Sequence, residues 1–373
     1  MSEVNEYKEE ISNNEPRKKT GKLKGWMIAL LIVLGLAIIL VALYFGWFLP
    51  TIRKPLAATL SLPQVSLATN TVAIPTESPT TEATITLTPE TSPTPTKPPV
   101  CGDEAVWNVL LVGVDTKGQN YLYGLSDVIR IAQIDFREMT VKMIALPRDL
   151  IVNAPEGLFE EENPIKINQA YLFGTAGWTG SSELGNGAVT LAQVIYSNFG
   201  IRVDHYGVVN FTGVMDFVDA LGGLTIDLPY EVYDPDPAYG YYPAGVQTLT
   251  GERTMDLMRI RTNYSDNFRI GNQSIVLKAI IKKMLDPAMI LKLPELIEAF
   301  RNSFLTDLSI EQIVNLGTCF LKNINTDNIS TAQPPEDILD QGMEYIPTLN
   351  GHSSVYRWDQ RLLDWIHSQI PEK

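Results

Sequence analysis

Asn108-Val-Leu-Leu-Val-Gly-Val114 is a short, continuous apolar run that ends at Asp115. Such a run is typical of a β-strand that is covered on both faces. Two further β-rich runs follow, Val128 to Asp135 and Thr140 to Leu146, separated only by Phe136-Arg-Glu-Met139. This short separation predicts that the second and third runs form an antiparallel hairpin.

The predicted hairpin determines which residues meet at its open end. Pairing outward from the four-residue turn sets Asp127 opposite Arg148. If the first strand runs parallel to the second hairpin strand, Asp115 arrives at the same end. The carboxyl ends of parallel strands are where open α/β sheets bind ligands. We therefore expect Asp115, Asp127 and Arg148 to lie together at one edge of the sheet.

Helical and strand patterns alternate along the rest of the chain. The interleaving predicts an α/β fold with helices on both faces of the sheet. Ser309 and Gln312 also have the spacing of a helix-capping box. From apolar periodicity we expect helices over 188–199, 214–221 and 275–285, and strands over 205–211 and 224–228.

Basic residues recur in the second half of the chain. Met258-Arg-Ile-Arg261 alternates with a period of two, so on a strand Arg259 and Arg261 would share one face. Two such arginines are either solvated or line an anion site, and the run by itself favours solvation. Arg269 and Gln273 would point the same way only if the following helix begins by Arg269.

Composition limits the possible functions. The 373-residue chain has a formal net charge of −14, which excludes a basic nucleic-acid-binding domain. Two cysteines exclude a multi-cysteine metal site, and three scattered histidines make a histidine-based metal site unexpected. Any anion that binds to so acidic a protein needs a local cluster of arginines or a metal ion.

The N-terminal region is predicted to hold the protein at the cell membrane. Residues 26–49 form an apolar segment, and about 20 apolar residues are enough to span a bilayer. Basic residues are more frequent in the tail 1–25 than just after the span, which predicts a cytoplasmic N-terminus and an extracytoplasmic main domain. A cleaved signal peptide is the alternative, but its apolar region would be shorter. Residues 50–100 are rich in proline and threonine and are expected to form an extended linker to a folded domain at 101–373.

Cys101 and Cys319 lie near the two ends of the expected domain. In an oxidising exterior they could form one disulfide that closes a very long loop. Two buried free thiols are the alternative, and we favour the disulfide.

Several motifs occur in an order that resembles the LytR–CpsA–Psr family, whose members attach glycopolymers to bacterial envelopes. The resemblance covers roughly residues 108–285 and is weaker towards the end of the chain. It is carried by Leu111-Val-Gly-Val-Asp115, Ser126-Asp127, Leu146-Pro-Arg-Asp149, Lys166-Ile-Asn168, Val209-Asn-Phe211, Asp219-Ala-Leu-Gly-Gly223, Leu249-Thr-Gly-Glu252, Arg259-Ile-Arg261 and Asp266-Asn-Phe-Arg269.

The resemblance implies a three-layer α/β/α domain with a mixed sheet and a phosphotransferase reaction. A glycan phosphate would move from a polyprenyl-pyrophosphate carrier to an acceptor hydroxyl of the cell envelope. By position, Asp115 and Asp127 match the acidic pair that binds Mg²⁺ and activates the hydroxyl. The residues that match the family's pyrophosphate-binding set are Lys166, Arg148, Arg259, Arg261, Arg269 and Gln273. The chemistry suits them, because phosphoryl transfer depends on positioning and charge neutralisation, and arginine binds phosphate oxygens in pairs.

The sequence also departs from the family pattern. Leu125 and Asn272 stand where the family usually has arginine, and Lys117 replaces a third arginine. If each of the first two losses removed one charge-assisted hydrogen bond, the cost would be roughly 3–6 kcal/mol. Taken without the resemblance, Arg148 and Asp149 could be an incidental surface ion pair and Asp115 a turn residue.

Two other functions remain open at this stage. The lost arginines favour a protein that binds the lipid-linked glycan without turning it over. A membrane-bound regulator of envelope genes is the other, but the predicted cytoplasmic segment has only about 25 residues and no DNA-binding pattern.

Overall fold

The computed structural model of the protein falls into two compact units, Met1–Arg53 and Lys54–Lys373. The predicted tail, residues 26–35 and 37 of the predicted membrane span, and linker residues 61–96 lie outside the residues that the structure describes. The described residues are 36, 38–60, 97–117, 121, 123–176, 178, 183, 185–236, 238–261, 266–292, 295–296, 299 and 304–371.

The described part of the first unit is helical and apolar. It ends in a π-helical turn, η1 (Tyr44–Phe48), and a short helix, α3 (Leu49–Arg53). Its apolar side chains are exposed, and Trp47 is 69% accessible. Within the described residues, no helix combines the length and the apolar content that crossing a bilayer requires.

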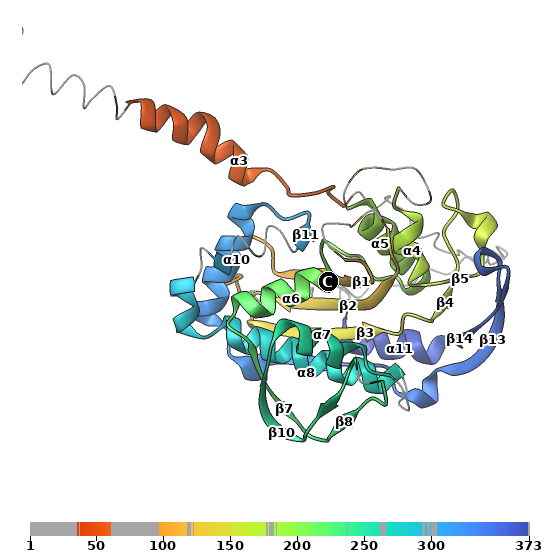
Figure 1. Ribbon diagram of the computed structural model, residues 1–373. Coiled ribbons are helices and arrows are strands. Elements are labelled where there is room, and N and C mark those ends of the chain that lie inside the picture. The colour runs from red at the N-terminus through yellow and green to blue at the C-terminus, as the bar shows by residue number, and fades with distance from the viewer. Residues whose placement is uncertain are drawn as a thin grey trace, which may run out of the picture. The chain divides into compact units, whose positions relative to one another are not determined.

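The second unit is built on a six-stranded mixed sheet with the strand order β11-β6-β1-β2-β3-β12 (Figure 1). The predicted hairpin is confirmed, because β2 and β3 pair from Ile129 opposite Leu146 to Asp135 opposite Thr140. Both β1 and β3 are antiparallel to β2 and therefore run in the same direction. The six strands are β1 (Val106–Val114), β2 (Ser126–Asp135), β3 (Thr140–Leu146), β6 (His205–Asn210), β11 (Phe304–Thr306) and β12 (Ile329–Ala332).

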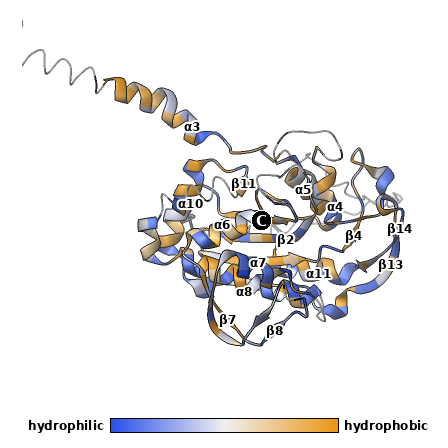
Figure 2. Ribbon diagram, in the orientation of Figure 1, coloured by the Kyte–Doolittle hydropathy of each residue, from blue (hydrophilic) through white to orange (hydrophobic). Residues whose placement is uncertain are grey.

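Helices cover both faces of this sheet. On one face, Ile129 and Ile131 of β2 belong to the largest apolar core, which includes residues of α4, α5 and α11. On the other face, Ala132 packs with residues of α8 and α10. The central strands and α5 are correspondingly hydrophobic in Figure 2. These helices are α4 (Gln169–Phe173), α5 (Asn186–Phe199), α8 (Asp266–Met284), α10 (Ile310–Asn323) and α11 (Gln360–Gln369).

Four two-stranded sheets surround the main one. The predicted strand Leu224–Leu228 is present as β7, but it pairs with β10 and not with the main sheet. The remaining elements are β4 (Ile151–Val152), β5 (Ile165–Lys166), α6 (Phe211–Ala220), β8 (Val232–Tyr233), β9 (Tyr241–Tyr242), β10 (Gly245–Leu249), α7 (Gly251–Arg259), β13 (Asp340–Ile346) and β14 (Gly351–Arg357), with 3₁₀ turns at Glu160–Glu162, Pro287–Lys292, Thr326–Asn328, Glu336–Ile338 and Pro347–Leu349.

Local sequence explains where several helices begin. The side chain of Asn210 accepts a hydrogen bond from the Gly213 N–H and caps α6. Thr250 caps α7 in the same way. The capping box predicted from Ser309 and Gln312 is confirmed at the start of α10, where each side chain bonds the other residue's backbone N–H.

The start of the predicted linker, from Lys54 on, is part of the second unit. Pro55 forms an isolated bridge with Ser309, and the Leu56 N–H donates to the Leu308 carbonyl at 3.4 Å. The Tyr206 hydroxyl donates to the Ala58 carbonyl at 2.6 Å. The first residues after Arg53 therefore pack against the domain.

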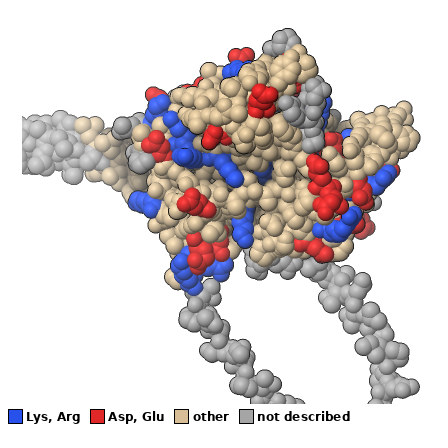
Figure 3. All heavy atoms as spheres, turned by 90° about the horizontal axis from the view of Figure 1, so that it is seen from below, with Lys and Arg blue, Asp and Glu red and all other residues tan. Residues whose placement is uncertain are grey.

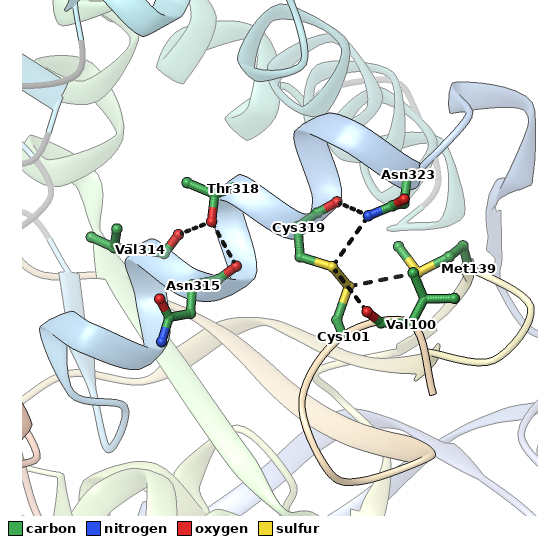
Figure 4. The surroundings of a disulfide bond; sticks show 8 residues. All are labelled: Val100, Cys101, Met139, Val314, Asn315, Thr318, Cys319 and Asn323. Carbon is green, nitrogen blue, oxygen red and sulfur yellow. Dashed lines mark hydrogen bonds between the residues drawn. A yellow bond between two sulfur atoms is a disulfide. The ribbon is translucent and has the colours of Figure 1, made fainter. Parts of the chain in front are cut away.

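The predicted disulfide is confirmed between Cys101 and Cys319, whose Cα atoms are 6.0 Å apart (Figure 4). Cys101 is buried beside Met139 and Phe136 at the hairpin turn, and Cys319 lies on α10. The bridge ties the segment before β1 to a helix that lies 218 positions further along the chain.

Replacing both cysteines with serine should lower the free energy of unfolding by about 3–5 kcal/mol, because closing so long a loop restricts the unfolded chain. Chemical denaturation of the wild type and of the double variant measures the difference. Wild-type protein treated with a reductant is the control and should match the double variant. Equal stability with and without the bridge would contradict this prediction.

Candidate functional site

A β-bulge presents Asp127 at the edge of the sheet. Gly113 of β1 pairs with Val128, but the next residue, Val114, pairs with Ser126. Asp127 therefore has no partner in β1, and a bulge of this kind turns the side chain of the extra residue. A Cβ atom on Gly113 would lie 2.9 Å from the Val128 Cβ, so the bulge requires glycine here.

A chain of alternating charges begins at Asp127. Its carboxylate lies 2.8 Å from Nη1 of Arg148, the residue predicted to stand opposite it. Arg148 also contacts Asp149, with 3.5 Å between Nε and Oδ2. Asp149 in turn pairs with Lys166 at 2.9 Å. The motif residues Arg148 and Asp149 thus form an ion pair within a larger network at the ends of β2 and β3.

The N-terminal turn of α8 joins this network. Because α8 begins at Asp266, Arg269 and Gln273 lie on one side of the helix, as the conditional prediction required. Arg269 is 4% exposed and pairs with Asp266 at 2.7 Å. Its Nη1 donates to the Asp127 carbonyl at 3.4 Å, which links α8 to the bulge.

Asp115 lies beside the network at the end of β1. The Leu125 N–H donates to Asp115 Oδ1 at 2.6 Å, and the Asp115 N–H donates to the Leu125 carbonyl at 3.1 Å. Desolvation and the charge of Asp127 raise the pKa of the Asp115 carboxyl, against the opposing effects of the Leu125 N–H and Arg148. Asp115, Asp127 and Arg148 therefore lie close enough to influence one another's charge, as predicted.

The charge state of Arg148 is set by three carboxylates. Burial opposes its charge, but Asp127, Asp149 and Asp266 more than offset that effect and raise the pKa of the guanidinium. Arg148 is therefore a permanent cation in the network.

The prediction that Arg259 and Arg261 lie on a strand is wrong. Residues Gly251–Arg259 form α7, which Thr250 caps, and the chain leaves the helix at Ile260. The exposed Arg259 guanidinium lies 4.8 Å from the centre of the Phe211 ring. The Phe211 N–H donates to the Thr116 carbonyl, so Arg259 faces the segment that follows Asp115.

Two further predicted residues take up different positions. Arg261 is exposed just beyond α7, and no ion pair to it is found among the described residues. Gln273 is buried, and its Nε2 donates to the Met258 carbonyl at 3.3 Å, which ties α8 to α7. The structure thus gathers Asp127, Arg148, Lys166 and Arg269 through direct contacts and through Asp149, with Asp115 alongside, whereas Arg259 contacts the Phe211 ring.

Sequence reasoning missed two residues of this site. The motif Asp266-Asn-Phe-Arg269 gives Asp266 no role by itself, although an acidic residue in the first turn of a helix is a recognisable signal. Tyr356 on β14 donates its backbone N–H to the Asp149 carbonyl at 2.9 Å. Burial and the carboxylates of Asp266 and Asp149 raise the pKa of its phenol, which therefore stays protonated. No local pattern indicated that the chain end returns here.

Several buried polar atoms near the site have no hydrogen-bond partner in the described part of the chain. They are Arg130 Nη1, Arg148 Nε, Asn168 Oδ1, Asp266 Oδ2 and Asn272 Nδ2. Buried polar groups normally have partners, so each such atom calls for an explanation. A polar ligand at the site would account for those that face it.

The carboxylate pair fits a magnesium ion that shares its ligands with a substrate. Mg²⁺ prefers oxygen and commonly takes one or two carboxylates together with substrate phosphates. Asp127 uses Oδ2 for Arg148, and Asp115 uses Oδ1 for Leu125, which leaves one oxygen on each. No group of three or more acidic, histidine or cysteine side chains suited to a metal occurs among the described residues.

The surface charge near the site differs from the protein's net charge. Figure 3 shows basic side chains around the centre of the face seen from below, with acidic groups among them and to one side. At the sheet edge, the contacts described above set Arg148, Lys166 and Arg269 close to Asp115 and Asp127, and such a mixture of cations and carboxylates suits a phosphate-containing ligand and a divalent ion.

The fold and this site define an α/β domain suited to binding an anion at the edge of its sheet. The LytR_cpsA_psr family model matches residues 72–368, so the chain belongs to this family. The expectation drawn from the sequence motifs is confirmed.

Curated relatives share the matched region at moderate identity. The chain is 28% identical over 229 residues to a polyisoprenyl-teichoic acid–peptidoglycan teichoic acid transferase TagU of Oceanobacillus iheyensis, with 61% of this chain and 66% of that protein aligned. It is 26% identical over 207 residues to the TagU protein of Halalkalibacterium halodurans, with 55% and 62% aligned. The matches thus span less than two thirds of these relatives.

Solved structures share the fold. The crystal structure of Bacillus subtilis TagV superposes with a TM-score of 0.54 at 22% identity, covering 70% of this chain and 94% of that one. The two proteins therefore share the α/β fold.

Replacing Asp115 with asparagine should raise the free energy of unfolding at pH 7 slightly, by up to about 1 kcal/mol. Because folding raises the pKa of Asp115, the folded protein binds the carboxyl proton more tightly than the unfolded chain does. The stability that this proton contributes is fully present below the unfolded pKa and is lost as the pH rises through the folded pKa. The charged carboxyl is thus a cost at pH 7, and the gain should shrink below about pH 4. Urea denaturation at both pH values measures it.

The matched change Asp127→Asn should have the opposite sign. It removes one partner of a 2.8 Å ion pair whose other member, Arg148, is mostly buried. A loss of about 1–3 kcal/mol is expected. A stabilising Asp127→Asn or a clearly destabilising Asp115→Asn would show that the charges are not arranged as described.

Gly124→Ala should destabilise the protein by about 1–2 kcal/mol more than Gly157→Ala does. Both glycines have positive φ, +104° and +80°, so both variants carry backbone strain. Only at Gly124 would the new Cβ meet neighbours, 2.5 Å from Thr116 Cγ2 and 2.8 Å from Asp115 Oδ1, whereas nothing lies within 4 Å at Gly157. Equal losses in urea denaturation would mean that the Gly124 loop does not close against Asp115.

Proposed function

We propose that the protein is a membrane-anchored phosphotransferase that moves a glycan phosphate from a polyprenyl-pyrophosphate carrier to a hydroxyl of a cell-envelope acceptor. The observation that carries the proposal is the convergence of Asp115, Asp127, Arg148 and Arg269 at the end of β1 and β2. These residues come from four separate stretches of sequence. A network of this kind supplies both the cations and the carboxylates that phosphoryl transfer requires.

The arginines have the role of binding and orienting the pyrophosphate. Arg148 and Arg269 are held by Asp127 and Asp266, so their guanidinium groups need little reorganisation when an anion arrives. Arg259 stands on α7 against the Phe211 ring, and Lys166, which is paired with Asp149, is a further positive charge. An exposed Arg261 can join them when the substrate is bound.

Asp115 has the role of proton acceptor. The acceptor oxygen forms a new bond to the phosphorus that carries the glycan, and the bond from that phosphorus to polyprenyl phosphate breaks. The hydroxyl proton passes to the Asp115 carboxylate, whose two oxygens have about four lone-pair sites and so can take a proton beside the Leu125 N–H and the ion. Asp127 is paired with Arg148, so Asp115 is the carboxylate of the two that is available to take the proton. Mg²⁺ held by Asp115 and Asp127 would offset negative charge on the pyrophosphate oxygens.

The relatives and the N-terminal sequence support the substrate class and the location. The curated relatives are named as transferases that act on polyisoprenyl-linked teichoic acid and peptidoglycan. By analogy, the donor here is a polyisoprenyl-linked glycan, and the acceptor is a polymer of the envelope. In this proposal residues 26–49 anchor the protein in the cell membrane, with the main domain outside the cell.

A second candidate function is binding of the lipid-linked glycan without turnover. The observation that favours it is Asn272, which is fully buried where the family usually has arginine and whose Nδ2 has no described partner. Leu125 likewise contributes a backbone N–H and no charge beside Asp115. The assay that tests the first function also separates the two.

Purified protein in detergent should release polyprenyl phosphate from a lipid-pyrophosphate-linked sugar when Mg²⁺ and an envelope glycan acceptor are present. Asp115→Ala and Arg148→Ala should each lower the rate by about 10²–10³-fold, because each removes a group that acts in the transition state. Omission of Mg²⁺ should have a comparable effect. Chromatographic detection of the released lipid measures the rate.

Arg137→Ala is the matched control. Arg137 pairs with Asp135 at 3.1 Å at the opposite end of β2, so its loss should leave the rate unchanged. Turnover that survives in both site variants would overturn the assignment of these residues. Tight binding of the substrate without turnover, converted to turnover by Leu125→Arg with Asn272→Arg, would establish the second function.

A further inference from the structure

Arg130 is a buried cation that the proposed mechanism has not used. It lies on β2 and is 2% exposed. Its Nη2 donates to the Ile270 carbonyl and to the Ser274 Oγ of α8, each at 3.0 Å. Its Nη1 has no hydrogen-bond partner, and no carboxylate pairs with Arg130 anywhere in the described residues.

The surroundings make this charge costly. Next along the same sheet face, Ala132 and Leu111 pack against Leu277 and Ile281 of α8. A charged group in such a layer carries a large desolvation penalty unless it is paired. A neutral glutamine could also hydrogen-bond to α8, so these two bonds alone do not explain an arginine. Burial lowers the pKa of Arg130 to about 10, which still leaves it charged at neutral pH.

Arg130 lies directly behind the candidate site. Ile270 and Ser274, which it bonds, are the neighbours in sequence of Arg269 and Gln273. Along β2 it is three residues from Asp127, which is about 10 Å of extended chain. Strand β2 and helix α8 both lead away from the site. The hydrogen bond from Arg269 to the Asp127 carbonyl joins them at the site, and the bond from Arg130 to the Ile270 carbonyl joins them further along.

We propose that the buried positive charge of Arg130 stabilises pyrophosphate at the site from a distance and compensates for the arginine that Asn272 replaces. The inference rests on the proposed function, since it assumes that the site binds pyrophosphate. The charge acts across protein of low polarity, where Coulomb interactions are stronger and are screened less by salt than at the surface. It therefore needs no direct contact with the ligand.

Binding of inorganic pyrophosphate with Mg²⁺ to the whole protein, followed by calorimetry, tests the role. Arg130→Met should weaken binding about 10-fold, and the difference should persist at high salt. Arg130→Lys should keep most of the affinity, because it keeps the charge. Arg137→Met, which removes a partly buried charge that is paired with Asp135 at the far end of β2, should leave binding unchanged.

A readout of stability separates this role from a structural one. Arg130→Met without ligand should be as stable as the wild type or more stable, because an unpaired buried charge is replaced by an apolar side chain. Adding Asn272→Arg to Arg130→Met should restore affinity. Wild-type affinity in Arg130→Met, or a parallel loss of stability and affinity in both Arg130 variants, would overturn the proposal for Arg130 alone. Failure of the wild type to bind pyrophosphate would overturn the proposed function together with it.

Discussion

The carboxylate of Asp127 and the guanidinium of Arg148 meet at 2.8 Å where β2 begins and β3 ends. Every other part of the candidate site is placed relative to this contact. The bulge frees Asp127 from the ladder of β1, and Arg269 reaches the Asp127 carbonyl from α8. Asp149 and Lys166 extend the network on the other side of Arg148. The ion pair therefore joins three separate elements of the fold at one edge of the sheet.

This arrangement reconciles an acidic protein with an anionic ligand. The chain as a whole carries a net charge of −14, so its overall field repels pyrophosphate. The local geometry of the site offsets this repulsion. Carboxylates hold the arginines in place, and a magnesium ion would share some of these carboxylates. A largely buried ion pair adds little net stability over a pair of apolar side chains, so the value of these pairs lies in fixing the direction of the guanidinium groups before the ligand arrives.

Much of this geometry was predictable, because β-hairpin pairing follows from a period of two and a short turn. That rule alone set Asp127 opposite Arg148. The assumption that the first strand runs parallel to the second hairpin strand then placed Asp115 at the same end. The prediction failed at Met258-Arg-Ile-Arg261, where four alternating residues were too few to distinguish a strand from the end of a capped helix. Arg130 and Tyr356 could not be found, since one is hidden by long-range packing against α8 and the other arrives from the chain end.

Diffraction from crystals grown with Mn²⁺ and pyrophosphate would locate both ligands directly, because manganese has an anomalous signal and replaces magnesium at oxygen-rich sites. We expect one manganese peak between Asp115 and Asp127, with pyrophosphate oxygens bound to Arg148 and Arg269. A manganese ion elsewhere, or a pyrophosphate held by other residues while these four side chains stay paired among themselves, would contradict the proposed site.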